Sequence, residues 1–298
     1  MDKNTIIITG VDGMLGGKIT RRILCDTDFQ VLGLTMNLSM PEVMMEREGI
    51  RKDDRVRFMT NEEFLNPSTR IGNLFGAVHL AFSRRMQPAK DIASSIDFAA
   101  SVFHRLAEVG ADRVINVSSQ GVYGNTEEIR KETTPPAPVN NYTMAKYASE
   151  KLFDDIMRES PHHTNLRLDP VAQSQNVVRR LCSSAIEGTI TLKGGKQVFS
   201  FIDAEDIGRA VVAMITSEGE WDSVYNVGWN RKRYTLVELA ELIAGISVDC
   251  GFKRPEIVLQ EDDTSLWAGM DSSKFMNKTG WVPEIDLKKT IAGMLKNQ

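Results

Sequence analysis

The chain opens with a predicted buried strand, a glycine turn and a helix in direct succession. Residues 4–9 form an apolar, β-branched run of strand length, which is typical of a strand covered on both faces. Gly10, Gly13 and Gly16 follow in the spacing G-x-x-G-x-x-G, and apolar residues then recur at helical spacing from Ile19. Glycines in such a turn let the backbone approach a pyrophosphate, which the helix N-terminus then faces. The segment fits a dinucleotide-binding turn and a plain strand–turn–helix equally, and either one predicts the first unit of a doubly wound sheet.

Strands and helices keep alternating through the first 169 residues. The further strands are predicted at residues 30–34, 55–59, 76–81, 113–117 and 165–168. One long helix with a single apolar stripe is expected between Pro88 and Gly110, and another contains Tyr142. This alternation is typical of an α/β fold with a parallel sheet, which binds ligands at the carboxyl ends of its strands. After Pro170 the pattern is less regular: residues 187–195 are rich in turn formers, 197–202 can form a strand and 204–215 a helix.

Three residues form a candidate catalytic set. Tyr142 and Lys146 stand at positions i and i+4, and Ser119 follows the strand predicted at 113–117. Residues i and i+4 of a helix share one face, so the phenol and the ammonium can reach the same cleft. A free tyrosine titrates near ~10, and a neighbouring ammonium favours the phenolate, so we expect Lys146 to lower the pKa of Tyr142. Ser119 could then hold the substrate oxygen whose proton Tyr142 exchanges.

Composition excludes several classes of protein. The chain has 298 residues, of which 42% are hydrophobic and 26% charged, and a net charge of −4, which fits one large or two unequal soluble domains. Mild acidity disfavours a nucleic-acid partner, which would need a concentrated basic face. Its three cysteines are far apart and none shows metal-ligand spacing, so we expect reduced thiols, no metal and a cytoplasmic location. No apolar run is long enough to cross a membrane.

Taken together, these motifs resemble the extended short-chain dehydrogenase/reductase family, in particular its NAD-dependent epimerase/dehydratase branch, over nearly the whole chain. The matching segments are Thr9–Gly16, Val78–Ala81, Ser119 to Gly124, Tyr142 to Lys146, Phe201–Ile207, Tyr225–Gly228, Asp271–Lys274 and Gly280–Pro283. The resemblance implies a Rossmann-type doubly wound parallel sheet with a smaller C-terminal α/β substrate domain. By this likeness, residues 1–169 form the NAD(P)-binding domain, with returning elements at about 204–228. Residues 170–203 and 229–298 form the substrate-binding domain.

The resemblance also implies which residues do what. Ser119, Tyr142 and Lys146 would be catalytic, with Lys146 also holding the nicotinamide ribose. The cofactor, NAD or NADP, would contact residues on the glycine turn and at the ends of the strands: Gly10, Gly13, Met14, Leu15, Gly16, Asn37, Asn61, Leu80, Ala81, Val117, Tyr142, Lys146 and Pro170.

Four positions depart from the family pattern. An acid that binds the adenosine ribose is expected after strand two, yet this chain has Thr35-Met36-Asn37, and its next acid is Glu42. No arginine stands there for a 2′-phosphate either, so the choice between NAD and NADP is open and Asn37 is the candidate contact. Thr60-Asn61 replaces an aspartate that holds adenine. Asp169-Pro170 replaces an Asn-Val-Tyr-Gly-Pro-like segment, and Ser200 replaces an arginine that often contacts the substrate diphosphate.

The expected activity is an NAD(P)-dependent epimerase or carbonyl reductase acting on a sugar, with a nucleotide sugar as the expected substrate. Dehydratases of the family carry Asp-Glu after the catalytic serine, whereas this chain has Gln120-Gly121, which disfavours dehydration. The alternative is a non-catalytic dinucleotide-binding sensor or scaffold. In relatives the two long helices pair with their copies. Phe98, Val102, Tyr147 and Phe153 suggest apolar outer faces, so we predict a homodimer.

Other polar residues have structural interpretations. His79 falls in a buried strand and is expected to be a core histidine. Asp206 lies in the first turn of a predicted helix, where an acid complements the helix dipole. Arg84 and Arg85 could contact a phosphate or simply be solvated. Trp229, Trp267 and Trp281 are expected to pack in the smaller domain.

Overall fold

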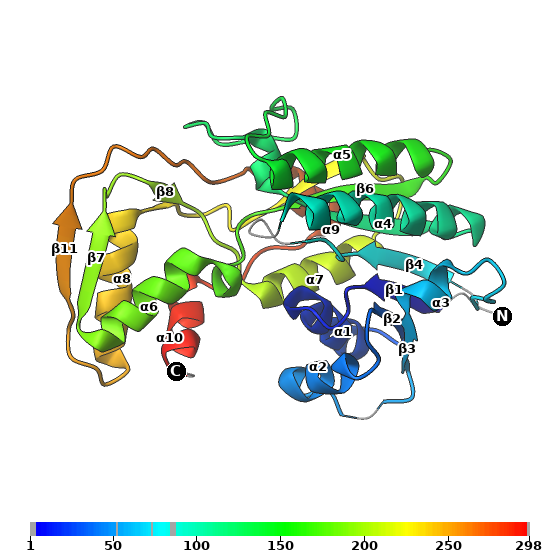
Figure 1. The fold of residues 1–298 in the computed structure, drawn as a ribbon, viewed down its shortest axis with the longest axis horizontal. Coiled ribbons are helices and arrows are strands. Elements are labelled where there is room, and N and C mark those ends of the chain that lie inside the picture. Colours follow the sequence, from blue (N-terminus) through cyan, green and yellow to red (C-terminus); the bar gives the residue numbers. More distant parts are fainter. Residues whose placement is uncertain (1–3, 52, 73, 84–87, 297–298) are drawn as a thin grey trace.

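Seven parallel strands form one central sheet in the order β3-β2-β1-β4-β5-β6-β9 (Figure 1). The computed structural model describes residues 4–51, 53–72, 74–83 and 88–296. The strands are β1 (Thr5–Thr9), β2 (Gln30–Thr35), β3 (Val56–Thr60), β4 (Leu74–His79), β5 (Arg113–Ser119), β6 (His162–Leu168) and β9 (Val224–Val227). The strand order reverses between β1 and β4, and doubly wound folds bind ligands at the carboxyl edge beside such a reversal. The predicted Rossmann-type fold is confirmed.

Helices cover both faces of this sheet. One face carries α1 (Met14–Asp26), α2 (Met40–Glu48) and α7 (Ala204–Ile215), and the other carries α3 (Asn61–Leu65), α4 (Ala89–Glu108) and α5 (Asn141–Ile156) (Figure 1). Side chains alternate across a strand. Ile6 and Ile8 of β1 therefore enter the core under α1 and α7, whereas Ile7 enters the core under α4 and α5. Both cores are apolar, which explains why β1 is a continuous β-branched run.

A smaller lobe has a hydrophobic core of its own, which includes Leu181, Ile190, Leu239 and Ile291. In it β7 pairs in parallel with β11, and β8 pairs antiparallel with β10. Its elements are α6 (Asn176–Glu187), β7 (Thr189–Lys193), β8 (Val198–Phe199), β10 (Tyr234–Thr235), α8 (Leu236–Asp249), β11 (Glu256–Gln260) and α10 (Leu287–Lys296). This lobe lies beside the central sheet (Figure 1).

The turn-rich segment at 187–195 contains a strand that its composition hides. Gly188 and Gly194 adopt left-handed φ angles of 96° and 73°, and these two turns bound β7. Within the strand Ile190 and Leu192 are buried while Thr191 is exposed. The period-2 alternation that predicts a strand is therefore present, but it is too short to stand out between the glycines.

Other boundaries shift by up to three residues, as at β6, which begins at His162 rather than at 165, and at β8, which ends at Phe199 rather than at 202. β4 ends at His79, so Leu80 and Ala81 lie beyond it, and β5 continues through Ser119. Helix α7 has the predicted bounds. A short helix, α9 (Ser273–Thr279), contributes Phe275 to the main core, and Trp281 packs beside it rather than in the smaller lobe as predicted. Arg84 and Arg85 lie outside the described residues.

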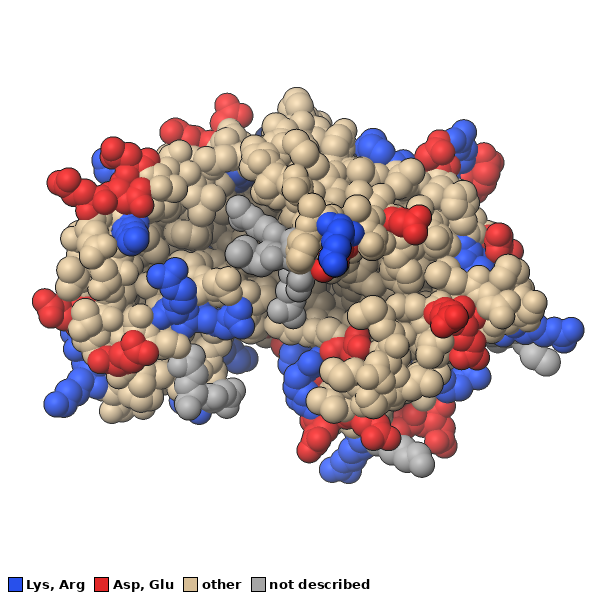
Figure 2. All heavy atoms as spheres, viewed as in Figure 1, with Lys and Arg blue, Asp and Glu red and all other residues tan. Residues whose placement is uncertain are grey.

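Surface features bear on possible partners. No helix in the described part of the chain is long and apolar enough to cross a membrane. On the face that Figure 2 shows, the described Lys and Arg side chains are interspersed with Asp and Glu. Cys25, Cys182 and Cys250 are free thiols.

Candidate active site

Ser119 and Tyr142 come from adjoining ends of β5 and α5. Ser119 is the last residue of β5 and caps the short 3-10 helix that follows it (Gln120–Tyr123). Its Oγ accepts a hydrogen bond from the backbone N–H of Gly121 at 3.1 Å. An ideal Cβ on Gly121 would lie 2.6 Å from Cγ2 of Thr143. Since that contact leaves room for no side chain, the turn after Ser119 lies directly on the first turn of α5, beside Tyr142.

Lys146 is buried beneath this junction. Its Nζ donates to the backbone carbonyl of Val117 at 2.9 Å and lies 4.0 Å from the ring centroid of Phe82. The same Phe82 ring meets Tyr142 edge-on at 6.1 Å between centroids. Residues from the ends of β4 and β5 and from α5 therefore enclose one small space, as the spacing of Tyr142 and Lys146 predicts.

The pKa values in this space differ from the sequence expectation. Burial lowers the pKa of Lys146 to about 7, an effect that Glu150 opposes. Burial raises the pKa of Tyr142 to about 12. The expectation that Lys146 lowers the Tyr142 pKa is therefore wrong for the protein without cofactor. The physical reason is that a buried ammonium is itself disfavoured and here points at the Val117 carbonyl.

A buried ion pair lies behind the site and was not anticipated. Glu150 accepts two bonds from Arg167, at 3.0 Å from Nε and 2.6 Å from Nη2, and one at 2.5 Å from the hydroxyl of Ser118. Arg167 also lies over the ring of Tyr123. With Glu150 so engaged, Lys146 keeps its Nζ on the Val117 carbonyl instead of forming a salt bridge. The sequence signal was the placement of Glu150 at i+4 from Lys146, on the same helix face.

The glycine turn after β1 is shaped by contacts that exclude side chains. Gly10 has a left-handed φ of 64°, and an ideal Cβ there would lie 3.2 Å from the backbone of Ala81. An ideal Cβ on Gly16 would lie 2.4 Å from the carbonyl oxygen of Gly10. The hydroxyl of Thr9 accepts the backbone N–H groups of Leu80 and Ala81 at 3.0 and 3.1 Å. These contacts bring Gly10, Gly16, Leu80 and Ala81 to one edge of the sheet.

The N-terminus of α1 faces this edge and suits an anion. Gly13 occupies the N-cap position, and no acidic residue stands in the first turn. The amides of Met14 and Leu15 are among the first-turn N–H groups, which have no partner within a helix and can bind phosphate oxygens. Gly13 is exposed, so a ligand can approach the backbone here.

Replacing Gly13 with valine should weaken dinucleotide binding by at least about tenfold, because the branched side chain would stand between the backbone and a pyrophosphate. Its ideal Cβ would also lie 3.1 Å from the Gly10 carbonyl oxygen, a tight contact that the turn can absorb. Calorimetric titration measures the dissociation constant of the dinucleotide, and thermal unfolding measures the stability of the fold. Gly245→Val, in α8 and with no atoms near its Cβ, is the matched control. An unchanged dissociation constant in Gly13→Val would mean that the dinucleotide does not lie on this turn.

The remaining predicted cofactor contacts end at the same edge. Asn61 follows β3, and its Oδ1 is buried without a hydrogen-bond partner in the described part of the chain. Asn37 follows β2 and is exposed, and its Oδ1 accepts both the N–H and the hydroxyl of Ser39. Pro170 follows β6, with its carbonyl bound to the N–H of Ile202 at 3.0 Å. The orphaned Asn61 oxygen and the side-chain-free surface at Gly13 fit a dinucleotide.

Two of the sequence departures contact each other. The hydroxyl of Ser200 donates to Oδ2 of Asp169 at 2.6 Å, and the N–H of Trp229 reaches the same oxygen at 3.3 Å. Burial raises the pKa of Asp169 to about 6. The Ser200 hydroxyl therefore binds Asp169 in the folded chain, and position 200 offers no guanidinium to a substrate diphosphate.

Two polar residues have structural roles, as expected. His79 is fully buried, with Nδ1 3.0 Å from the Thr9 hydroxyl, and burial lowers its pKa to about 3. Asp206 is fully buried in α7 and accepts the backbone N–H groups of Glu284 and Ile285. It ties the C-terminal segment to the central domain.

Comparison with known proteins extends these observations. The sequence model of the family described as "NAD dependent epimerase/dehydratase family" matches residues 6–228. The dTDP-glucose 4,6-dehydratase of Neisseria gonorrhoeae is 21% identical over 99% of this chain and 97% of its own length. The solved UDP-Glc/GlcNAc 4-epimerase of Campylobacter jejuni has a TM-score of 0.82 at 21% identity, covering 99% of this chain and 98% of that one. The UDP-glucuronic acid 4-epimerase of Bacillus cereus, solved with UDP-glucuronic acid and NAD, has a TM-score of 0.82 at 17% identity, covering 98% and 99%. Such structural likeness shows a shared fold.

Proposed function

Because the chain belongs to the NAD dependent epimerase/dehydratase family, we propose that it is an NAD-dependent enzyme that epimerises or reduces the sugar of a nucleotide sugar, with Tyr142 exchanging the hydroxyl proton. The observation that carries the proposal is the enclosure of Tyr142 and Lys146 by the ends of β4 and β5, beside Ser119. The relatives named above support a nucleotide sugar as the substrate class.

Each of the three residues has a defined task. Ser119 lies at the strand end and can hold the reacting oxygen of the substrate. Tyr142, with its pKa near 12, is a protonated phenol at neutral pH and can donate its proton to that oxygen. To act as a base it must first ionise, which an approaching positive charge favours. When bound, NAD would accept a hydride and supply the positive charge of its nicotinamide, and its reduced form NADH would donate the hydride to a carbonyl.

Lys146 is placed to hold a ribose hydroxyl. Its ammonium has one carbonyl partner, Val117, and is otherwise packed against Phe82. A ribose oxygen would give this buried group a further hydrogen bond and raise its pKa from about 7. The ammonium would then favour the Tyr142 phenolate, as the i and i+4 spacing of the two residues predicts.

The residues after Ser119 favour epimerisation or reduction over elimination. Gln120 and Gly121 carry no acid, and Cβ contact with Thr143 leaves no space for a carboxylate at position 121. Some relatives are dehydratases by name, so the reaction type needs its own test. An epimerase returns the hydride to the same substrate and retains its dinucleotide, whereas a reductase releases it each turnover. Denaturing the purified protein and quantifying the liberated dinucleotide by chromatography distinguishes them: near-stoichiometric NAD favours an epimerase, and none favours a reductase.

Substrate binding is assigned to the side of the smaller lobe, as the likeness to the family implies. Residues 170–203 and 229–298 would supply the substrate side, although Phe275 and Trp281 pack in the main core. A cytoplasmic location is part of the proposal and is supported by the three free thiols.

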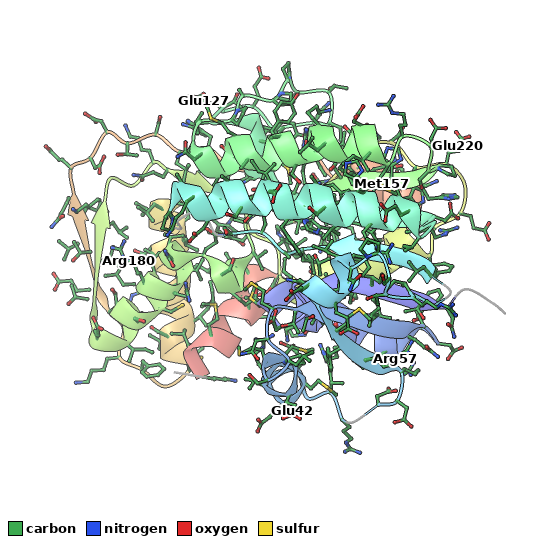
Figure 3. The ribbon with its side chains drawn as sticks, turned by 45° about the vertical axis from the view of Figure 1, so that its right-hand side comes forward. Glu42, Arg57, Glu127, Met157, Arg180 and Glu220 are labelled. Atoms are coloured by element: carbon green, nitrogen blue, oxygen red, sulfur yellow. The ribbon has the colours of Figure 1, made fainter. Side chains whose placement is uncertain are left out.

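We still predict a homodimer, but its interface must involve residues other than the buried ones that the sequence suggests. Val102 and Phe153 are fully buried in the core beneath α4 and α5, and Phe98 is half-buried, so these residues do not form an outer face. Helices α4 and α5 lie side by side across the sheet (Figure 3). Met144 and Leu152 of α5 are 54% and 36% exposed. A two-fold pairing of this helix pair would cover them.

Leu152→Glu should therefore convert a dimer to a folded monomer, because it places a charge in the apolar contact. Light scattering gives the mass, and circular dichroism checks the fold. Val248→Glu, at an exposed valine in α8, is the control and should stay dimeric. A wild-type mass of one 33.3 kDa chain at micromolar concentration would contradict the prediction.

A further inference from the structure

The carboxylate of Asp12 lies where the missing ribose-binding acid is expected. Asp12 is in the glycine turn between Gly10 and Gly13, yet its Oδ2 accepts a hydrogen bond at 2.8 Å from the hydroxyl of Thr35, the last residue of β2. In dinucleotide-binding folds an acid at the end of this strand binds the adenosine ribose hydroxyls. The turn after β1 thus brings a carboxylate to the end of β2.

The other candidates at this edge are occupied or point elsewhere. Asn37 Oδ1 already accepts two hydrogen bonds from Ser39. Met36 is 87% exposed and has no group that binds a hydroxyl strongly. Glu42, the first acid after β2, lies on the outer side of α2, away from the sheet (Figure 3). In the described part of the chain, Oδ1 of Asp12 has no hydrogen-bond partner and is free to accept one.

We propose that Asp12 holds the adenosine ribose of the dinucleotide and makes the protein select NAD(H) over NADP(H). A carboxylate accepts strong hydrogen bonds from both ribose hydroxyls, and it repels the 2′-phosphate that NADP carries in place of one of them. Thr35 fixes the carboxylate at the strand end through the bond to Oδ2. The inference rests on the proposed function, since it requires that a dinucleotide binds at this turn.

Arg47 contacts this turn, and its hydrogen bonds argue against a role with a 2′-phosphate. Its Nη2 donates to the carbonyl of Gly13 at 2.9 Å and its Nη1 to that of Asp12 at 3.4 Å. Its Nε pairs with Glu48 at 2.8 Å. The guanidinium therefore contacts the turn from α2 and pairs with Glu48, and a 2′-phosphate bound to it would also lie beside the carboxylates of Asp12 and Glu48.

Fluorescence titration of the purified protein with NADH and with NADPH tests the assignment. Wild type should bind NADH at least about tenfold more tightly than NADPH, since each tenfold corresponds to about 1.4 kcal/mol and a hydrogen bond to a charged group contributes at least that much. Asp12→Asn should bind NADH about tenfold more weakly, with NADPH unchanged or tighter. Asparagine keeps an oxygen for the Thr35 hydroxyl, so the turn should persist. Asp112→Asn, at the opposite edge of the sheet beside the start of β5, is the control and should keep the wild-type preference.

Arg47→Ala distinguishes a turn that binds the ribose hydroxyls of NAD through Asp12 from one that binds the 2′-phosphate of NADP through Arg47. We expect it to leave the ratio of NADH to NADPH affinity unchanged. A selective loss of NADPH affinity in this variant would put the 2′-phosphate on Arg47 and overturn the assignment. A wild type that binds NADPH as tightly as NADH, or an Asp12→Asn variant that keeps the wild-type preference, would overturn it too. Failure of both dinucleotides to bind wild type would instead contradict the proposed function.

Discussion

Tyr142→Phe should lower turnover by about 10³-fold, within the range for loss of a general acid–base group, while the dissociation constant for NAD stays nearly unchanged. The substitution removes one hydroxyl and keeps the ring that packs edge-on against Phe82, so the fold and the cofactor cleft should persist. Steady-state kinetics on a nucleotide sugar that wild type converts, together with calorimetric titration of NAD, measure the two quantities. The loss should appear in kcat rather than in KM, because the phenol acts on the reacting oxygen.

Tyr147→Phe provides the matched control for this result. Tyr147 lies five residues further along α5 and is half-buried against the cluster that contains Tyr123. Its variant should keep wild-type turnover. If Tyr142→Phe also kept wild-type activity, the proton would have to be exchanged by another group, and the catalytic assignment would be refuted.

Lys146→Met should have two opposite effects: cofactor-free protein becomes more stable, and NAD binding and turnover are largely lost. The pKa of Lys146 falls from 10.5 to about 7 in the folded chain because of burial, with Glu150 opposing the fall. Unfolding then takes up a proton between pH 7 and 10.5, so the native state is penalised most below pH 7. The fall of about 3.5 pKa units, at about 1.4 kcal/mol for each unit, means that removing the buried amine should raise the free energy of unfolding by roughly 4 to 5 kcal/mol at pH 7.

The gain in stability of the Lys146→Met variant should depend on pH. The gain from Lys146→Met should be full below pH 7, shrink as the pH rises through the window from 7 to 10.5, and vanish above it, where both states are uncharged. Denaturant unfolding across this window measures it. Lys151→Met, at an exposed lysine of the same helix paired with Asp154, is the control and should show no such gain. A Lys146→Met variant less stable than wild type at pH 7 would mean that the buried ammonium stabilises the fold.

Local patterns predicted the elements that carry the site. The continuous β-branched run of β1 is typical of a strand buried on both faces, and the spacing of Tyr142 and Lys146 follows the helical period. Both local signals survive in the folded chain because β1 and α5 pack in the core of the central sheet. Helix α7 was predicted to the residue for the same reason.

What the sequence could not give depends on contacts between distant residues. The bond from Thr35 to Asp12 joins the end of β2 to the glycine turn after β1, and that from Ser200 to Asp169 joins the two lobes. No single-sequence pattern encodes either pairing. The prediction that the pKa of Tyr142 is lowered was wrong for a similar reason. The i+4 spacing predicts that Tyr142 lies near Lys146, but it does not predict how deeply the two side chains are buried. The faces of α4 and α5 were misjudged because two packed helices hide more than one narrow stripe from solvent.

The proposed function is tested most directly by nuclear magnetic resonance of wild-type protein with a panel of UDP- and dTDP-hexoses in the presence of NAD, and with keto forms of these sugars in the presence of NADH. The account predicts that at least one of these sugars changes at a hydroxyl-bearing ring carbon, and that the Tyr142→Phe variant leaves the same sugar unchanged. Calorimetry on the same preparation establishes whether NAD is bound. Bound NAD with no conversion of any sugar in the panel would contradict the enzymatic account and favour a dinucleotide-binding sensor.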